Sequence, residues 1–438
     1  MFADFHLSPL RDPRDQVTEK MRYSKESLVS KCLMDEVGFP EGGGKAWLVV
    51  FGSWCALFSS LGIMNTMGAF QEHISSHQLQ HLDVSIVGWI FSLYAFLTFG
   101  VGLFVGPVFD TYGPRYLVIS GSILVVLSMT LVGYCTELWH FIMCFSILGG
   151  VGSALLFSPS IAIVGHYFNK RRGTATGIAT TGGAFGGIVY PLILQVLIPK
   201  IGFSWTTKVI AGISLMLCLF ANIFIKGRLP PSPDANARPD IRILARPAFA
   251  TTVLGVFLLE FALFVPLTYV TSYSLAQGFS PTFSFLVLPI LNLGSVFGRW
   301  LPGFIADKIG RFNTAVIAII LTVAAVLGVW LPVGNTKPGL VIFALLFGFA
   351  SGSNISLTPV CVSQLCSIEN YGRYYSTCFS IVSLGCLTGV PIAGRILDVG
   401  NGSYGGLIFF VGLVYAGGLI AFLWARLIAT GLKLGVKY

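Results

Sequence analysis

Two ionisable side chains stand inside long apolar stretches of the sequence, where a charge is costly and is usually kept for a function. The first, Arg299, occurs in the sequence NLGSVFGRWLPG, about six residues, or roughly 9 Å, before the end of an apolar run. An arginine stays protonated and offers a planar fork of donors that matches a carboxylate. This position indicates a side chain that faces an aqueous cavity and binds an anion there.

The second such group is Glu260, about a dozen residues into another apolar run, in the sequence VFLLEFALF. A carboxyl group near the middle of a membrane could carry a proton or neutralise Arg299. Both residues also have plainer interpretations. Arg299 could extend along its aliphatic stem to the nearer membrane surface, and Glu260 could be protonated and packed against neighbouring polar atoms.

Other polar and aromatic side chains fall within apolar runs and could line the same cavity. They are Asn65, Tyr94, Tyr269, Asn292 and Asn354. Each of them alone is more typical of a contact between helices than of a contact with a ligand.

Three histidines, His73, His77 and His81, follow one another at a spacing that could bind a metal ion if the segment were a helix. No cysteine or carboxylate completes the set, so we interpret them as part of a solvated loop. No phosphate-binding loop, nucleophile elbow or zinc-protease pattern occurs in the sequence. We therefore predict no cofactor, no enzymatic activity and no ATP-driven pump.

The composition requires a membrane around these residues. The chain has 438 residues, of which 55% are hydrophobic and only 10% are charged, and its mean hydropathy is +0.81. A soluble domain carries roughly 25% charged residues. The net charge of +9 does not indicate nucleic-acid binding, because the basic residues are scattered through short loops between apolar runs. The nine cysteines form no C-x-x-C pair and are predicted to be free, buried thiols.

Apolar runs of about 20 residues cross a bilayer as helices. We predict twelve of them, which makes the protein an all-α polytopic membrane protein. Their approximate ranges are 46–70, 84–107, 116–135, 138–164, 174–198, 205–226, 248–275, 283–305, 314–332, 339–363, 374–398 and 404–428. Most of the 27 lysine and arginine residues fall in the tails and in alternate loops, which predicts that both termini are cytoplasmic.

The longest polar break between predicted spans runs from Gly227 to Arg246 and contains the sequence PPSP. It divides the chain into two sets of six spans. The predicted organisation is a disordered cytoplasmic tail (1–45) with a short helix near Glu26–Val37, a first six-helix bundle (46–226), a cytoplasmic linker (227–247), a second six-helix bundle (248–430) and a short cytoplasmic tail (431–438).

The two halves carry the same loop pattern, Gly-x-x-x-Asp-x-x-Gly, after their second span. A carboxylate in this position can pair with a loop arginine or cap the next helix. Ordinary turn charges are the alternative, but recurrence at matching positions is typical of the repeats of a major facilitator transporter. The residues are Gly106, Asp110, Gly113 and Arg115 in the first half, and Gly303, Asp307, Gly310 and Arg311 in the second half.

Two further motifs precede the first and the fifth predicted spans. One reads EGGGKAW from Glu41, and the other reads YFNKRRGTATG, with the signature residues Tyr167, Lys170, Arg171, Arg172, Gly173 and Gly177. The basic residues must lie outside hydrocarbon, whereas the glycines that follow let a helix approach a neighbour closely. Together with Arg299, these motifs resemble the monocarboxylate porter family, a branch of the major facilitator superfamily, over residues 41 to about 428. Short segments such as SLTP, which ends at Pro359, are similar to the corresponding segments of fungal members of this family.

The resemblance implies a major facilitator fold, with two pseudo-symmetric six-helix bundles around a central cavity. It also implies that Arg299 binds a substrate carboxylate and that the Gly-x-x-x-Asp loops form a latch for the outward-open state. Two departures concern animal members of the family. An aspartate one turn before the arginine is Ser295 here, and a lysine in the first span is replaced by Met64-Asn65. These departures put lactate–proton symport by that route in doubt.

We therefore predict a secondary transporter that moves a small organic anion, a mono- or dicarboxylate, by alternating access. Glu260 is the predicted proton-coupling group, and the protein is expected to act as a monomer in the plasma membrane. One alternative is a facilitator or exporter of a larger or neutral solute, such as riboflavin or a secondary metabolite. The alternative from another class is a membrane sensor that transports nothing.

Overall fold

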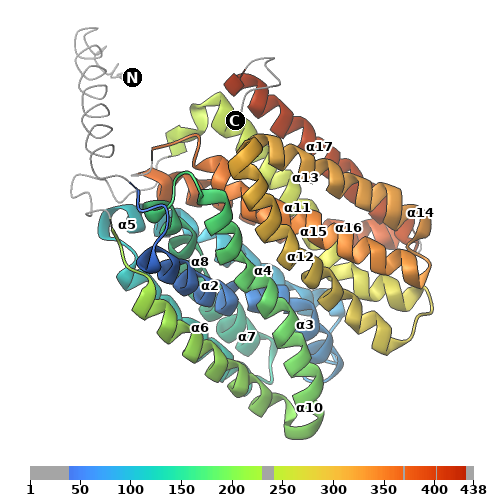
Figure 1. Cartoon of the computed structure of the whole chain (residues 1–438). Coiled ribbons are helices and arrows are strands. Elements are labelled where there is room, and N and C mark those ends of the chain that lie inside the picture. The colour runs from blue at the N-terminus through green and yellow to red at the C-terminus, as the bar shows by residue number, and fades with distance from the viewer. Residues whose placement is uncertain (1–38, 229–240, 368–369, 401, 431–438) are drawn as a thin grey trace, which may run out of the picture. The chain divides into compact units, whose positions relative to one another are not determined.

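Figure 1 presents the computed structural model of the chain, which describes residues 39–228, 241–367, 370–400 and 402–430. The chain separates into two compact units, Met1–Pro40 and Glu41–Tyr438, and the second unit holds all the described helices. The predicted tail helix near Glu26–Val37, most of the predicted linker and the tail after residue 430 lie outside the described residues. The boundaries of the two predicted bundles stay a prediction.

The described part of the chain before residue 229, here called the first half, consists of apolar helices separated by short breaks. They are α2 (Gly44–Asn65), α3 (Met67–Ser76), α4 (Val84–Gly100), α5 (Gly102–Tyr112), α6 (Arg115–Val132), α7 (Leu138–Phe141), the π-helix η1 (Ile142–Gly149), α8 (Gly150–Ala162), α9 (Val164–Tyr167) and α10 (Arg172–Phe224).

The described part after residue 240, here called the second half, is built in the same way. It contains the 3₁₀ helix η2 (Ile241–Ala245), α11 (Pro247–Ala276), α12 (Pro281–Ile309), α13 (Arg311–Ala325), the π-helix η3 (Val326–Trp330), α14 (Leu331–Val333), α15 (Lys337–Val362), α16 (Tyr371–Val399) and α17 (Tyr404–Thr430). All regular structure in the described residues is helical, as the composition predicts for a chain that must satisfy its backbone in lipid.

Eleven helical stretches of the described chain are long and apolar enough to cross a membrane. One of them, α10, has 53 residues and would be about 80 Å long if straight, more than twice the thickness of a bilayer core. Its backbone is broken at Gly202, where φ is +78°, a conformation that glycine adopts without strain. The two arms of α10 (green) meet at a turn at the lower edge of Figure 1. Because α10 accounts for two spans, the arrangement agrees with the twelve predicted ones.

The first span differs from its prediction at its far end. α2 gives way to α3 at Thr66, whose hydroxyl donates to the carbonyl oxygen of Gly62 at 2.7 Å, and α3 then continues to Ser76. His73 therefore lies half-buried on a helix rather than in a solvated loop, which corrects the sequence-based interpretation, whereas His77 is exposed. No group of three or more metal-binding side chains comes together in residues 39–228, 241–367, 370–400 and 402–430, which the structure describes.

Glycines bring α10 close to helices of both halves, as the sequence predicts. A side chain at Gly177 would collide with the carbonyl oxygen of Arg299 on α12, and one at Gly186 would collide with Gly62 on α2. Without a hydrophobic driving force in lipid, such close backbone approach holds helices together by van der Waals contact. The small-residue face of α10 therefore joins α2 of its own half to α12 of the other.

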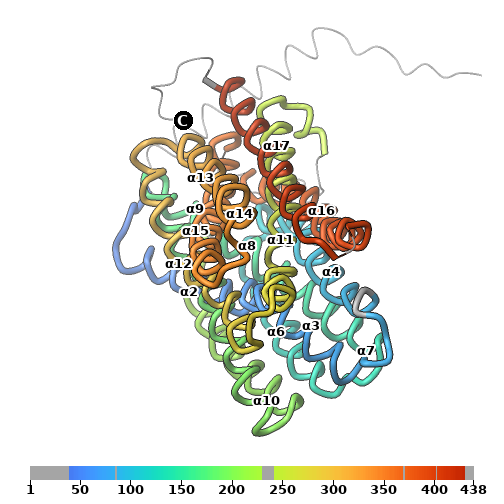
Figure 2. The backbone as a smooth tube through the Cα atoms, turned by 90° about the vertical axis from the view of Figure 1, so that its right-hand side faces the viewer, coloured from blue at the N-terminus to red at the C-terminus, as the bar shows by residue number. Residues whose placement is uncertain are grey.

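The two halves meet along two seams. In one seam α10 packs against α12, and in the other α16 packs against α4 and α5. Figure 2 shows α16 (red-orange) beside α4 (cyan). Each seam pairs a helix of the first half with a helix of the second, so a movement of one half relative to the other alters both.

Candidate functional site

The interface between the halves has two ends. α12 begins at Pro281 and finishes at Ile309, and α16 runs in the opposite direction from Tyr371 to Val399. We call the end near Lys170–Arg172, Ile309 and Tyr371 the basic end, and the other the cavity end.

Asp307 closes the basic end on the first seam. Its carboxylate accepts hydrogen bonds from the backbone N–H of Gly173 at 2.8 Å, from the backbone N–H of Thr174 at 2.8 Å and from the hydroxyl of Thr174 at 2.7 Å. These donors belong to the first turn of α10, where N–H groups have no partner within the helix and the dipole favours an anion. A carboxylate of the second half thus caps a helix of the first half.

Asp110 does the equivalent at the second seam. Its carboxylate accepts from the N–H groups of Gly372 at 3.1 Å and Arg373 at 2.9 Å, at the start of α16. A side chain at Gly106 would collide with the carbonyl oxygen of Gly372, so this glycine permits the approach. The duplicated sequence pattern therefore corresponds to two reciprocal caps between the halves. Positive φ angles of +79° at Gly113 and +108° at Gly310 end α5 and α12.

The two arginines of the repeated pattern have different surroundings. The guanidinium of Arg311 donates to the carbonyl oxygen of Asn169 at 2.8 Å and to the hydroxyl of Ser363 at 3.1 Å, and so joins the halves. Arg115 is exposed and makes no hydrogen bond with another described residue. From the first half, the guanidinium of Arg172 lies 4.1 Å from the ring centroid of Tyr371, a cation–π contact across the seam.

The two signature motifs bind each other. The carboxylate of Glu41 accepts from the backbone N–H groups of Asn169 at 3.0 Å, Lys170 at 2.6 Å and Arg171 at 3.1 Å. The ring of Trp47 packs on Phe168 with centroids 5.1 Å apart. Successive N–H groups form an anion-binding nest, so Glu41 holds the loop just before the residues that Asp307 caps. The sequence placed Glu41 in a motif, but only the fold supplies its partner.

Arg299 is buried within the seam between α10 and α12, with 2% of its surface exposed. Its Nε donates to the hydroxyl of Ser295 at 3.2 Å, and a terminal nitrogen donates to the carbonyl oxygen of Thr180 at 2.6 Å. Ser295 lies one turn nearer the cavity end, so the side chain extends into the membrane interior rather than to the basic end. The arginine thereby joins the two halves at mid-depth.

Glu260 is buried on α11, with 3% of its surface exposed, and lies within electrostatic range of Arg299. Glu260 and Arg299 do not form an ion pair with each other, since no carboxylate oxygen of Glu260 lies within 4.0 Å of a guanidinium nitrogen of Arg299. Glu260 also interacts electrostatically with Tyr375 and Tyr415, whose buried hydroxyls have no hydrogen-bond partner in the described chain. The carboxyl group is therefore buried within the second half, with two tyrosine side chains in electrostatic range.

Two predicted asparagines also contact α10. The Asn65 amide donates to the carbonyl oxygen of Gly183 at 3.0 Å. The Asn292 amide donates to the carbonyl oxygen of Gly187 at 3.4 Å, across the seam. Here both amides join neighbouring helices, which is the plainer of the roles that the sequence allowed.

The remaining predicted residues lie apart from one another. The Tyr94 hydroxyl is 2.7 Å from the hydroxyl of Ser153, and the Asn354 amide donates to Thr322 at 3.4 Å, within each half. The Tyr269 hydroxyl donates to the carbonyl oxygen of Val390 at 3.3 Å, and its side chain lines a cavity between the halves. The structure thus does not gather the predicted solute-binding residues around one space.

A central cavity of about 620 Å³ opens at the cavity end, lined by both halves. α3, α4 and α10 contribute from the first half, and α11, α12 and α16 from the second. Its charged lining residues are Glu72, Arg395 and Asp398, which sequence reasoning did not select because they lie near predicted span ends. Neither Arg299 nor Glu260 lines it.

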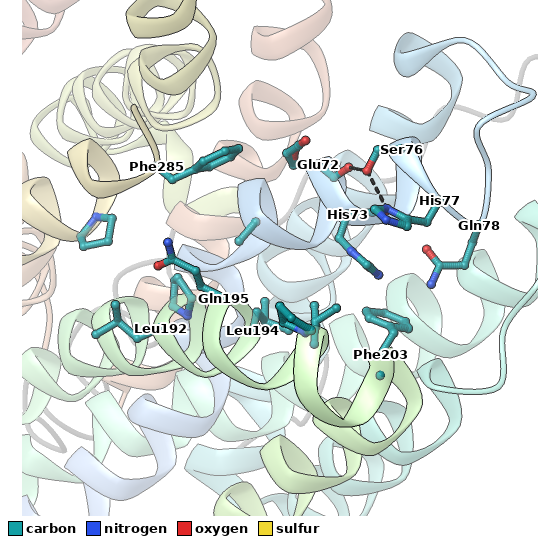
Figure 3. A pocket seen from close by; sticks show the side chains of 16 residues that line it. Glu72, His73, Ser76, His77, Gln78, Leu192, Leu194, Gln195, Phe203 and Phe285 are labelled. Carbon is teal, nitrogen blue, oxygen red and sulfur yellow. Dashed lines mark hydrogen bonds between the residues drawn. The ribbon is translucent and has the colours of Figure 1, made fainter. Parts of the chain in front are cut away.

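A side cavity of about 770 Å³ adjoins the central one. Figure 3 shows His73 of α3 and His77, the residue that follows α3, on the side opposite Leu194 and Gln195 of α10, with Phe285 of α12 to one side. The two cavities share five lining residues, namely Ala69, Glu72, Pro191, Phe285 and Pro289. A molecule in one would therefore touch residues of the other.

Comparisons with known proteins identify the class. Residues 50–389 match the model of the Major Facilitator Superfamily. The chain is 37% identical over 401 residues to the MFS transporter asaE of Aspergillus flavus, covering 91% of this chain and 90% of that protein. It is 35% identical over 420 residues to the riboflavin transporter MCH5 of Saccharomyces cerevisiae, covering 90% and 80%. It is also 35% identical over 427 residues to the fujikurins efflux protein of Gibberella fujikuroi, covering 96% and 90%.

Among solved structures, the fold is similar to the crystal structure of the human organic anion transporter MFSD10, with a TM-score of 0.71. The alignment covers 87% of this chain and 100% of that one at 17% identity, so it supports the fold alone. The chain belongs to the Major Facilitator Superfamily. It is an integral membrane transporter and not an enzyme, as the sequence predicts. These relatives show the superfamily, and membership of the monocarboxylate porter branch stays a prediction.

Proposed function

We propose that this transporter carries an amphipathic organic molecule, of the size of riboflavin or a secondary metabolite, by alternating access between its halves. The observation that carries the proposal is the central cavity. Its volume of about 620 Å³ is in the range of sites for drug-sized ligands and far exceeds a three-carbon acid. The relatives named for riboflavin transport and for efflux of fujikurins support a solute of this size.

The charges around the central cavity support the same choice. Glu72 and Asp398 are carboxylates, and Arg395 is the single lining cation among the described residues. A small anion would gain no net attraction from this set. The buried Arg299 already donates to Thr180 and Ser295, so in this state it does not present its full fork to a solute.

The transport cycle follows from the two ends of the interface. Opening of the basic end requires Asp307 and Asp110 to leave the helix starts that they cap, at about 0.5–1.5 kcal/mol net for each hydrogen bond. The same movement would bring α3 and α4 towards α11 and α16 and close the central cavity. We infer from the lysine and arginine placement that the basic end is cytoplasmic, so this state is outward-open. A monomer in the plasma membrane, with both termini cytoplasmic, belongs to the same proposal.

A second candidate is proton-coupled transport of an organic anion, as in a monocarboxylate porter. The observation that favours it is that two ionisable residues, Arg299 in the seam and Glu260 on α11, are both buried and lie within electrostatic range of each other. In another state of the cycle, separation of α10 from α12 would free the guanidinium from Thr180. A carboxylate could then replace that carbonyl oxygen, with Glu260 taking up the proton.

Flux through the full-length protein in proteoliposomes separates the two candidates. Riboflavin and labelled lactate serve as solutes, each with and without a pH gradient. The first proposal expects riboflavin flux that persists without the gradient and in Arg299→Gln. The second expects lactate flux that needs the gradient and is lost in Arg299→Gln. Arg115→Gln is the matched control, because it removes an exposed arginine. Lactate flux with that dependence on Arg299 would overturn the first proposal.

A further inference from the structure

The side cavity is lined mostly by apolar residues, with a few polar side chains among them. Leu194 and Ile198 of α10 and Pro289 of α12 are buried or half-buried lining residues, whereas Glu72 and Gln195 are exposed lining residues. Its volume of about 770 Å³ exceeds that of the central cavity. A space of this kind favours a molecule with an apolar body and a few polar groups.

One wall of the side cavity is a stack of rings. His73 lies between His77, with centroids 4.3 Å apart, and Phe203, with centroids 4.9 Å apart, and both pairs are nearly parallel. The ring of His77 is held at the end of α3 by Ser76, whose hydroxyl is 2.9 Å from its Nδ1. Such a wall is stiff and presents aromatic edges and faces to a planar ligand.

The polar groups of this cavity do not favour an anion. Burial, assisted by the neighbouring His77, lowers the pKa of His73 to about 4, so its imidazole is neutral at neutral pH. Glu72 is the charged residue among the described lining, and it repels anions. Oε1 of Gln78, another lining residue, is buried and has no hydrogen-bond partner in the described chain. A rotation of the Gln78 amide towards the cavity would offer this acceptor to an N–H donor of a ligand.

We propose that the side cavity is a second solute site, which holds an uncharged planar ring system beside the central cavity. The inference rests on the proposed transport of an amphipathic solute and adds where its ring portion binds. The shared residues Glu72, Pro191 and Phe285 make the two sites continuous. A solute longer than either space would place its ring against the histidine stack and its polar chain in the central cavity.

Binding of lumichrome, an uncharged three-ring probe, tests the inference on purified full-length protein by fluorescence titration. We expect about two equivalents bound by the unaltered protein and about one by Gln195→Trp, which fills the side cavity, or by Ser272→Trp, which fills the central one. Gln80→Trp, on the exposed turn after α3, is the matched control and should keep both sites.

The ring stack is tested separately. His73→Phe preserves stacking and should retain the second equivalent, whereas His73→Ala should lose it. A melting temperature close to that of the unaltered protein shows that each variant is folded. Unchanged stoichiometry in both Gln195→Trp and His73→Ala overturns the inference, as does absence of lumichrome binding. Riboflavin flux in proteoliposomes tests the transport proposal separately. If Gln195→Trp leaves this flux unchanged, the proposed transport is retained and the second site is rejected.

Discussion

The basic end and the cavity end of the interface are held in different ways. At the basic end, carboxylates of each half bind backbone N–H groups of the other at 2.8–3.1 Å. No hydrogen bond joins the halves between two of the described residues that line the central cavity, and the bond from the Asn292 amide to the carbonyl oxygen of Gly187 lies deeper in the seam. The hydrogen bonds of a carboxylate to the first N–H groups of a helix depend on direction, so each is either formed or broken. The walls of an open cavity can instead approach each other gradually. The comparison indicates that the basic end sets which state is populated, and that the cavity end follows.

A common measurement tests this comparison. A reporter cysteine at position 272, Ser272→Cys, lies on the wall of the central cavity and can be labelled with a membrane-impermeant maleimide. The eight described native cysteines are buried or half-buried and should react slowly. Weakening of the basic end shifts the population away from the cavity-open state, so the labelling rate should fall.

The largest effect is expected from removal of the Asp307 cap. Asp307→Ala deletes three hydrogen bonds between the halves and should shift the equilibrium by about 3 kcal/mol, or roughly a hundredfold. Asp110→Ala deletes two and should shift it less. Equal labelling in Asp307→Ala and in the unaltered reporter would show that the caps do not control the state.

Overpacking of the seam should come next. Gly177→Val places a side chain against the carbonyl oxygen of Arg299 and should cost about 1–3 kcal/mol in the state with α10 and α12 in contact. The labelling rate should fall accordingly. Gly212→Val is a control, because no heavy atom of the described chain lies within 4 Å of a side-chain carbon placed there. A fall of the same size in both variants would point to general instability.

The two repeated arginines sharpen the comparison. Arg311→Ala removes donors to Asn169 and Ser363 and should lower reporter labelling by about tenfold, from a loss of about 1.4 kcal/mol. Arg115→Ala should leave labelling unchanged, since that side chain is exposed and has no partner in the described chain. Equal responses would mean that the repeats act symmetrically, contrary to the geometry.

The smallest effect should follow from Glu41→Gln. The amide keeps one acceptor oxygen for the loop Asn169–Arg171 but loses the charge, at about 1 kcal/mol, or roughly fivefold. Because Glu41 acts on the loop rather than across the seam, its effect should shrink greatly in an Asp307→Ala background. Full additivity of the two changes in reporter labelling would argue against this coupling.

Much of the fold could be predicted because its signals are local. Hydropathy located the spans to within a few residues, and it separated the two spans, 174–198 and 205–226, that the helix α10 joins across Gly202. The repeated Asp110 and Asp307 were recognised as a pair from spacing alone. The same reasoning placed His73 in a loop, since periodicity does not show that α3 continues past a break at Thr66.

The partners in the site could not be read from spacing. Asp110 and Gly372 are 262 positions apart in the chain, and Asn65 and Gly183 are 118 apart. The predicted solute-binding set, Arg299 included, was chosen by polarity at membrane depth, yet Tyr269 is its one member that lines the central cavity among the described residues. Depth in the membrane follows from position along a span, but the direction of a side chain depends on which helix packs beside it.

The sequence by itself determined that this chain crosses a membrane through paired six-span repeats, because apolar runs and glycine spacing act along a single segment. The tertiary structure alone decided that each repeat's carboxylate caps a helix of the other half and that the cavities open at the far end. The physical reason is that a hydrogen bond or a cavity needs atoms from several helices at defined distances, and only the packing of those helices sets the distances.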